Sequence, residues 1–140
     1  MGRAYHCRVV RIVGCFLEHD RRFLILRRHP RQAFGDTWGL PAGTVERDER
    51  DDEAMLRELK EETGFSASGS SLEHLGTFPL GDDGQTSFVT YRVRLRHAPP
   101  VTLHDVEHVD YRWVTPEECD AMADTIPTFR QLLRLVRYVT

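Results

Sequence analysis

The segment from residue 43 to residue 65, GTVERDERDDEAMLRELKEETGF, constrains the chain most, because it predicts an amphipathic helix with three glutamates near its end. With 3.6 residues per turn, Glu58, Glu61 and Glu62 share an arc of roughly 100°, and apolar side chains fill the adjoining arc. Like charges four residues apart destabilise an isolated helix by about 0.2–0.5 kcal/mol, and cations are favoured at this helix end. A bound divalent cation would remove both penalties. The segment therefore predicts a metal site, although acidic residues on a helix are more often only a solvated surface.

The spacing of the residues around these glutamates identifies the segment. Gly43 is followed after five residues by Glu49, and after seven more by the run RELKEETGF at residues 57–65. This order reproduces the Nudix box at every defined position, so the chain resembles the MutT-like Nudix hydrolases. Members of that family hydrolyse a pyrophosphate bond in a nucleoside diphosphate linked to another moiety. The resemblance implies one Nudix domain over residues 1–140, with the box at 43–65, and an α/β/α sandwich in which a mixed sheet lies between helices.

The pattern along the rest of the chain predicts the same α/β class, because strands precede and follow one central helix. That helix begins near Asp51, where acidic residues fill the first turn, and Gly64 ends it in the left-handed C′ position. The run from Thr115 to Glu118 is a capping box that opens a short helix. The other predicted elements are strands at 9–17, 23–26, 44–46, 72–80, 87–95 and 109–114, the first two forming a hairpin, and a closing helix at 127–139.

The resemblance also implies a set of metal ligands. Glu58 and Glu62 are then the central ligands, and Glu61 is a further ligand or the partner of a bound water. The main-chain carbonyl of Ala42, just before the box glycine, often ligates a metal in this family; glycine is commoner there. The expected ion is Mg²⁺, for which Mn²⁺ can substitute, because Mg²⁺ binds carboxylates together with substrate phosphates. The ion would neutralise the diphosphate and activate the attacking water.

Four other box residues are expected to support this cluster. Arg57, counted with the catalytic set, is expected to orient the glutamates rather than to contact phosphate. It would do so through a bidentate pair with Glu49 that locks the preceding loop onto the helix. Gly43 and Gly64 are the structural glycines of the box.

The general base is left open among three glutamates, which are Glu58, Glu61 and Glu107. Glu107 lies outside the box, before a strand that ends in Trp-Val, and this element resembles the one that carries a further base or ligand in the family. Asp105 is the second candidate there, and an ordinary exposed loop glutamate is an equally good interpretation of Glu107. His104 and His108 flank Glu107, but no cysteine or third histidine stands at ligand spacing to indicate a zinc site.

Residues that contact the substrate are expected before the box. Arg27 and Arg28 end the second predicted strand, and either could reach a phosphate or ribose, with solvent-facing charge as the equal alternative. Phe34 and Trp38 lie in the segment that enters the box. Either ring could stack on a base, although such a tryptophan is more often part of the core.

The box indicates how a bond is cut but not which substrate carries it. A MutT-type hydrolase of nucleoside or deoxynucleoside triphosphates is the first choice, because no motif of the NADH-cleaving or coenzyme A members is present. ADP-ribose or a nucleotide sugar is the alternative, and Pro79 stands close to the proline associated with ADP-ribose hydrolases. Asp83 stands near the tyrosine position of dinucleoside polyphosphate hydrolases. A nucleotide-binding Nudix domain without turnover remains, although its usual sign is a broken box.

Composition disfavours several other classes. A formal net charge of −3 argues against a stable nucleic-acid partner, and no apolar stretch is long enough for a membrane span. The resemblance implies a small-molecule nucleotide as the partner, and a homodimer is left open because many relatives pair. Cys7, Cys15 and Cys119 are odd in number and form no CxxC pair, which favours reduced, space-filling thiols in a cytoplasmic protein.

Overall fold

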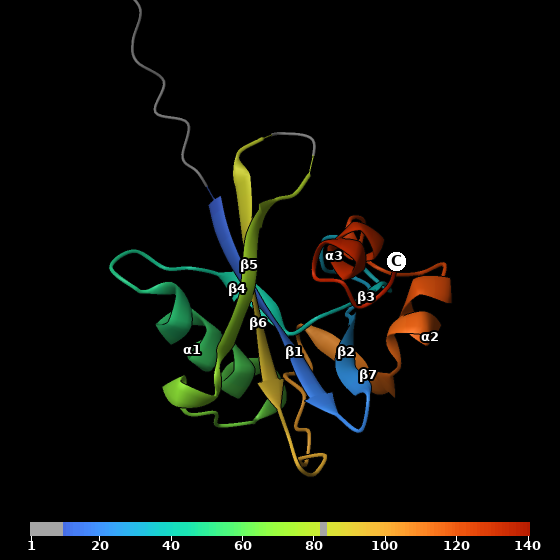
Figure 1. The fold of residues 1–140 in the computed structure, drawn as a ribbon, viewed down its shortest axis with the longest axis horizontal. Helices are drawn as coiled ribbons and strands as arrows, with labels where there is room; N and C mark the ends of the chain where they lie inside the picture. Colours follow the sequence, from blue (N-terminus) through green and yellow to red (C-terminus); the bar gives the residue numbers. More distant parts are fainter. Residues whose placement is uncertain (1–9, 82–83) are drawn as a thin grey trace, which may run out of the picture.

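The computed structural model describes residues 10–81 and 84–140, so the expectations for Cys7, Val9 and Asp83 fall outside the described residues. Figure 1 shows α1 on one side of the strands, with α2 and α3 on the other. The elements are β1 (Val10–His19), β2 (Arg22–Arg28), β3 (Trp38–Gly39), β4 (Ala42–Thr44), α1 (Asp51–Thr63), the 3-10 turn η1 (Gly69–Ser71), β5 (Glu73–Pro79), β6 (Thr86–Arg94), β7 (His108–Val114), α2 (Pro116–Ala121) and α3 (Phe129–Leu135).

A seven-stranded mixed sheet forms the centre of the fold, with β3, β2, β1, β6 and β5 in this order. β1 and β6 run parallel, and the other pairs are antiparallel. β1 pairs with β2 beside the hairpin turn, at Glu18–Phe23 and His19–Arg22, and then pairs with β4, whereas β2 pairs with β7. The sheet therefore divides into a β4 branch (β1, β4, β5 and β6) and a β7 branch (β2, β3 and β7).

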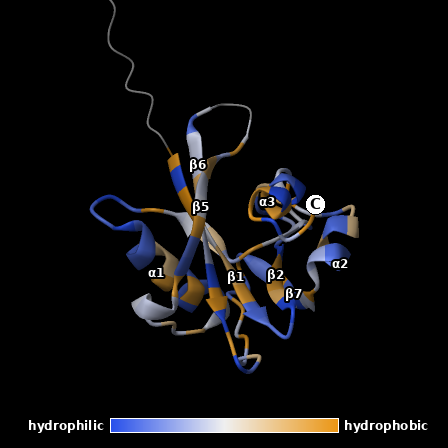
Figure 2. Cartoon of the chain, in the orientation of Figure 1, coloured by the Kyte–Doolittle hydropathy of each residue, from blue (hydrophilic) through white to orange (hydrophobic). Residues whose placement is uncertain are grey.

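Side chains alternate across the sheet and build a core on each face. Val13, Cys15 and Leu17 of β1 belong to the cluster that holds the buried residues of α1. Phe16, which lies between them in sequence, belongs to the opposite cluster with Cys119 of α2 and the buried residues of α3. Figure 2 shows hydrophobic residues along the central strands and a hydrophilic loop leading into α1. Helices on both faces of a mixed sheet confirm the predicted α/β/α sandwich.

The helix boundaries that depend on local chemistry are confirmed. α1 begins at Asp51 with acidic residues in its first turn, and Gly64 ends it in the left-handed region at φ 77°. The Gly64 amide donates to the Lys60 carbonyl at 3.0 Å. At α2, the Glu118 amide donates to the Thr115 hydroxyl and the Thr115 amide donates to the Glu118 carboxylate, both at 3.1 Å, which is the predicted capping box.

Two elements differ from the sequence pattern. The strand expected at 44–46 is β4 at Ala42–Thr44, because its register with β1 places Ala42 opposite Gly14 and brings the box glycine into the sheet. The closing helix expected at 127–139 is α3, only seven residues long. Thr128 and Arg137, at φ 80° and 64°, lie in the left-handed region at its two ends. The second turn directs the chain back toward the sheet, where the hydroxyl of Tyr138 hydrogen-bonds the carboxylate of Glu18.

Burial explains the two described cysteines. Cys15 and Cys119 are free and fully buried, one in each core. Burial raises the pKa of both thiols, that of Cys119 to about 12, so both stay neutral at physiological pH and fill space.

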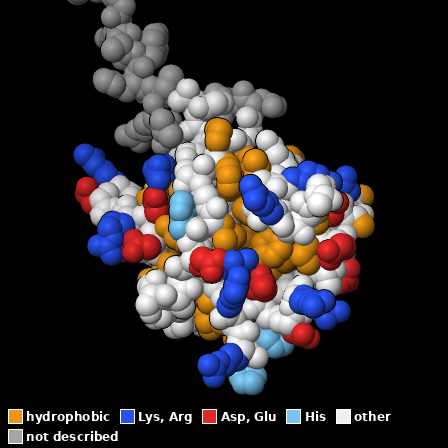
Figure 3. All heavy atoms as spheres, viewed as in Figure 1, with side chains coloured by type: hydrophobic (Ala, Val, Ile, Leu, Met, Phe, Trp, Pro, Cys, Tyr) orange, Lys and Arg blue, Asp and Glu red, His pale blue; other side chains and the backbone are white. Residues whose placement is uncertain are grey.

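No helix in the described ranges is long and apolar enough to cross a membrane. Figure 3 shows acidic and basic side chains next to one another on the viewed face.

Candidate active site

Two of the three glutamates near the end of α1 are buried where this helix packs against the sheet. Glu58 is 8% exposed and Glu62 is 2% exposed, whereas Glu61 lies on the exposed side of the helix. A β-carbon at Gly43 would overlap the carboxyl group of Glu58. The box glycine is therefore needed because the backbone of β4 and the Glu58 carboxylate approach each other closely.

Arg57 neutralises one side of this acidic surface. Its Nε and Nη2 atoms donate to the two carboxylate oxygens of Glu49 at 2.8 and 3.0 Å, which is the bidentate pair expected from the resemblance. Its Nη1 atom donates to Glu58 at 2.8 Å and to Glu61 at 3.3 Å. Nη2 also donates to the carbonyl of Thr44 at 3.2 Å. Arg57 thus joins the loop before α1, strand β4 and the glutamates, and its hydrogen bonds hold the pKa of Glu49 below its usual value.

Glu62 is neutralised much less by its surroundings. The amide of Ala42 donates to its Oε1 atom at 2.9 Å. Burial raises the pKa of Glu62 well above its usual value, and the nearby charges of Glu58 and Glu107 raise it further, against the influence of Arg28. The pKa of Glu58 is also raised by burial, but its contact with Arg57 opposes the shift. The expected carbonyl ligand of Ala42 stays a prediction.

The loop before β7 brings two more donors to Glu62. Glu107 and His108 each offer a ligand atom, and these atoms and one from Glu62 all lie within 4.8 Å of one another. His108 is 4% exposed, and its Nδ1 atom has no hydrogen-bond partner among the described residues. Burial lowers the pKa of His108 to about 4, with help from Arg28 and His104, so its ring is neutral at pH 7. The group therefore combines Glu62 of α1 with Glu107 and His108 of the β7 branch.

The structure separates the candidates that the sequence placed side by side on this loop. Glu107 reaches the box, whereas Asp105 is exposed and lies outside the group of ligand atoms. Sequence spacing does not indicate His108 as a ligand, because no cysteine or third histidine stands at zinc-ligand distance from it. Its place directly after Glu107, at the start of a strand, is a signal that could have included it.

The four residues expected to contact substrate have different surroundings. Arg27 Nη2 lies 3.3 Å from Asp36, and Arg28 Nε donates to the Ala33 carbonyl at 2.7 Å, so both arginines contact the loop before β3. Phe34 of that loop is 61% exposed. Trp38 is 3% exposed and packs in the second core. Its ring is enclosed by core side chains, which agrees with the core interpretation of Trp38 rather than with base stacking.

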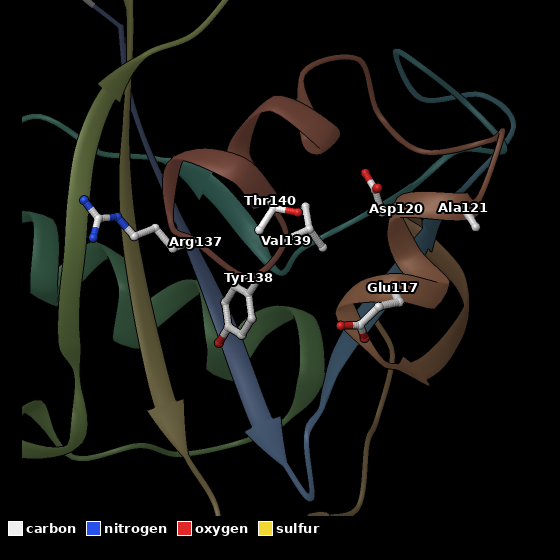
Figure 4. A pocket seen from close by; sticks show the side chains of 7 residues that line it. All are labelled: Glu117, Asp120, Ala121, Arg137, Tyr138, Val139 and Thr140. Carbon is white, nitrogen blue, oxygen red and sulfur yellow. The ribbon is translucent and has the colours of Figure 1, made fainter.

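Two surface pockets differ in their relation to this site. A small apolar pocket of about 60 Å³ includes Ala42, with Leu40, Phe88 and Phe129 among its lining residues. A more open pocket of about 420 Å³ is lined by residues of α2 and by residues that follow α3, as Figure 4 shows. The expected site residues do not line this larger pocket. The small pocket is the one that adjoins the glutamate cluster, through Ala42.

The order of box, strands and helices is shared with known proteins. The family model of the NUDIX domain matches residues 7–135, which is nearly the whole chain. This chain belongs to the NUDIX family. It is 27% identical over 113 residues to the CTP pyrophosphohydrolase of Escherichia coli (strain K12), and the match covers 79% of each protein. It is 30% identical over 106 residues to phosphatase NudJ of the same strain, covering 76% of this chain and 68% of that protein.

Solved structures of the family have the same fold. The MutT protein from Methanosarcina mazei Go1 matches with a TM-score of 0.76 over 96% of both chains, at 24% identity. The E. coli ORF135 protein also matches with a TM-score of 0.76, over 97% of this chain and 94% of that one, at 24% identity. The chain is therefore a Nudix hydrolase in fold and in box.

The donor atoms of this Nudix hydrolase fit a divalent cation, which enzymes of the family generally require. Glu62 and Glu107 supply carboxylate oxygens and His108 supplies a ring nitrogen, and Glu58 lies close enough to raise the pKa of Glu62. Buried carboxylates that repel one another bind a proton or a metal ion to reduce the cost of burial. The site thus meets the chemical requirement for an ion that also binds phosphate oxygens.

Proposed function

We propose that this Nudix hydrolase is a metal-dependent nucleoside triphosphate pyrophosphohydrolase that uses Mg²⁺, with Mn²⁺ able to replace it. The observation that supports this most strongly is the group of facing carboxylates of Glu58, Glu62 and Glu107, which repel one another. Arg57 is the guanidinium that hydrogen-bonds into this group, and it contacts Glu58. The negative charge beside Glu62 would repel a bare triphosphate, so a cation must accompany the substrate.

Each residue of the cluster has a proposed role. Glu58 and Glu62 hold the ion, and the Ala42 carbonyl is a further candidate ligand. The ion supplies charge neutralisation of the phosphates and a bound water with a lowered pKa. Arg57 positions Glu58 and Glu61 through its hydrogen bonds.

Glu107 is our first candidate for the general base. Its side chain is 46% exposed and so can be reached by substrate and water, yet it lies within 4.8 Å of the Glu62 ligand atom. Glu58 and Glu61, the other candidates, are both hydrogen-bonded to Arg57, so their carboxylates are already engaged. A base must be able to reach the attacking water, and Glu107 combines access with proximity to the ion.

The proposed base site is the small apolar pocket beside Ala42. At about 60 Å³ the pocket is too small to enclose a nucleobase, so the base would lie against its apolar opening. Ala42 also donates its amide to Glu62, so base and phosphates would lie on the two sides of β4. Arg28 lies close enough to influence the pKa of Glu62, so it is the arginine that we expect to contact a phosphate. The similarity to the E. coli CTP pyrophosphohydrolase supports a nucleoside triphosphate as the first substrate class.

A substrate panel tests the proposal. Release of phosphate and pyrophosphate should be measured for ribonucleoside and deoxynucleoside triphosphates, ADP-ribose and nucleotide sugars, with Mg²⁺ or Mn²⁺. We expect a triphosphate to be the best substrate, and excess chelator to abolish turnover until metal is restored. Turnover that persists in excess chelator would refute metal dependence. A silent panel with tight nucleotide binding would instead indicate a binding domain without turnover.

A further inference from the structure

His108 is a buried polar side chain that the fold leaves without a partner. Its Nδ1 atom has no hydrogen-bond partner among residues 10–81 and 84–140, although the residue is 4% exposed. A buried nitrogen without a partner destabilises a protein by about 1–3 kcal/mol, so a ligand at this position would relieve that penalty. A ring nitrogen of His108 lies within 4.8 Å of ligand atoms of Glu62 and Glu107.

We propose that His108 is a metal ligand and that Glu62, Glu107 and His108 form a mixed oxygen and nitrogen site that selects Mn²⁺ and related transition ions over Mg²⁺. This mixed site adjoins the carboxylate of Glu58. The inference relies on the proposed function only for the expectation that a divalent ion binds here. It uses one carboxylate oxygen of Glu107 as a ligand and leaves the other oxygen for the proposed role as base.

The backbone explains how two consecutive residues reach one site. Successive side chains of a regular strand point to opposite faces of a sheet. At the start of β7 the register is irregular, because Arg27 pairs with Asp110 but Arg28 pairs with His108, so Val109 is an extra residue. Such a bulge redirects side chains and is common next to active sites.

Hydrogen bonds hold this irregular turn in place. The amides of Glu107 and His108 both donate to the His104 carbonyl, at 2.9 and 3.0 Å. The amide of His29 donates to the Glu107 carbonyl at 2.8 Å. The two side chains are therefore positioned by their backbone, and metal binding would not have to order a flexible loop.

The donor set determines the metal preference. Mg²⁺ requires oxygen ligands and keeps several waters, whereas imidazole nitrogen is a good ligand for first-row transition ions. Two carboxylates and one neutral imidazole would balance a divalent charge and leave positions free for water or phosphate oxygens. Affinities at such a site should follow the order for transition ions, with Mn²⁺ weaker than Co²⁺.

His104 provides a matched control. It lies in the same loop, and its Nδ1 atom is 3.6 Å from Glu107, but it is exposed and not part of the group of ligand atoms. The test compares the wild-type full chain with His108→Leu, His108→Gln and His104→Gln, all freed of metal and then loaded with one equivalent of Mn²⁺. Pulsed electron paramagnetic resonance detects nitrogen bound to Mn²⁺, and calorimetry gives the Kd values of Mn²⁺ and Mg²⁺.

We expect nitrogen coupling in the wild type and in His104→Gln, and its loss in both His108 variants. The Kd of Mn²⁺ should rise about tenfold or more in the His108 variants, and that of Mg²⁺ should change little. Bound Mn²⁺ without nitrogen coupling in the wild type, or coupling that survives in a folded His108 variant, would overturn the inference. So would the absence of Mn²⁺ binding to the wild type. The wild-type spectrum decides the question even if both His108 variants fail to fold.

The same samples separate this inference from the proposed function. Oxygen-only Mn²⁺ coupling together with triphosphate hydrolysis would refute the nitrogen ligand and leave the enzyme assignment standing. Nitrogen coupling without hydrolysis of any substrate in the panel would support the nitrogen ligand and refute the proposed triphosphate hydrolysis.

Discussion

Glu58 and Glu62 lie one turn apart on α1 and are both buried, yet they are stabilised by opposite means. Glu58 accepts a hydrogen bond from Arg57 at 2.8 Å, and its carboxyl group lies against the backbone of Gly43. Glu62 accepts one from the Ala42 amide and is more deeply buried, and its pKa is raised further above the usual value than that of Glu58.

The difference shows which part of the site the protein completes by itself. Around Glu58 the chain supplies its own cation, so this side is formed before any ligand arrives. Around Glu62 the carboxylates of Glu58 and Glu107 add repulsion, and Arg28 opposes it only through its field. We infer that the Glu62 side is the one whose stability depends on a bound ion or proton.

The largest expected effect comes from neutralising either glutamate. Glu58→Gln and Glu62→Gln should each lower kcat by about a hundredfold, because a metal-held carboxylate is lost and an amide oxygen is a weaker ligand. Steady-state kinetics with the best substrate of the panel measures this. Glu117→Gln, an exposed glutamate on α2, is the control and should keep wild-type activity. Near-normal turnover in either box variant would refute the assignment.

A smaller effect is expected from Arg57→Lys, which keeps the charge but removes the planar fork. Lysine cannot bind both oxygens of Glu49 and also reach Glu58, so kcat should fall about tenfold through misplacement of the glutamates. Arg50→Lys changes a highly exposed arginine just before α1 and should change kcat little. Equal kinetics for the two variants would show that Arg57 is not the brace of the site.

Gly43→Ala tests the close approach on the Glu58 side. The added methyl group would displace the Glu58 carboxylate, and overpacking of this kind lowers the free energy of unfolding by about 1–3 kcal/mol. Urea denaturation measures the change. Gly69→Ala is matched, since a β-carbon at Gly69 meets nothing within 4 Å. An unchanged unfolding midpoint for Gly43→Ala would mean that Glu58 can move freely.

The smallest effect distinguishes the two glutamates most directly. For a carboxyl group with a raised pKa, the folded protein binds the proton more tightly than the unfolded chain does. Its contribution to stability is therefore present below the usual pKa and is lost as the pH rises through the raised value. In metal-free protein at pH 8, Glu62→Gln should then raise Tm by about 2–4 °C, and the gain should vanish at pH 4.

Glu58→Gln should not show this gain, because it replaces the charged acceptor of Arg57 Nη1 with a neutral amide oxygen and so weakens that hydrogen bond. Calorimetry of both metal-free variants across this pH range makes the comparison. Identical pH dependence of Tm for the two variants would contradict the asymmetry between the two sides of the box.

Local chemistry explains how much of the fold and site could be predicted. The first turn of α1, the stop at Gly64 and the capping box at Thr115 depend on neighbouring residues, so the sequence pattern predicts them correctly. The pair of Arg57 and Glu49 also follows from the box. Each of these features is determined within about ten residues of chain.

Features that need distant partners were beyond the pattern. The place of β4 depends on its register with β1. His108 becomes a candidate ligand only because β7 pairs with β2 and carries an extra residue there. The spacing of residues along the sequence does not reveal such contacts between strands that are distant in the chain.

The proposed metal site lies between the two branches of the sheet. Ala42 and Glu62 belong to the half built on β1 and α1, whereas Glu107 and His108 belong to the half built on β2. An ion bound by both Glu62 and Glu107 would cross-link the two halves of the sheet. Metal should then slow amide hydrogen exchange at the start of β7, although β7 is distant in sequence from the box. Binding of the ion would therefore also make the protein more rigid.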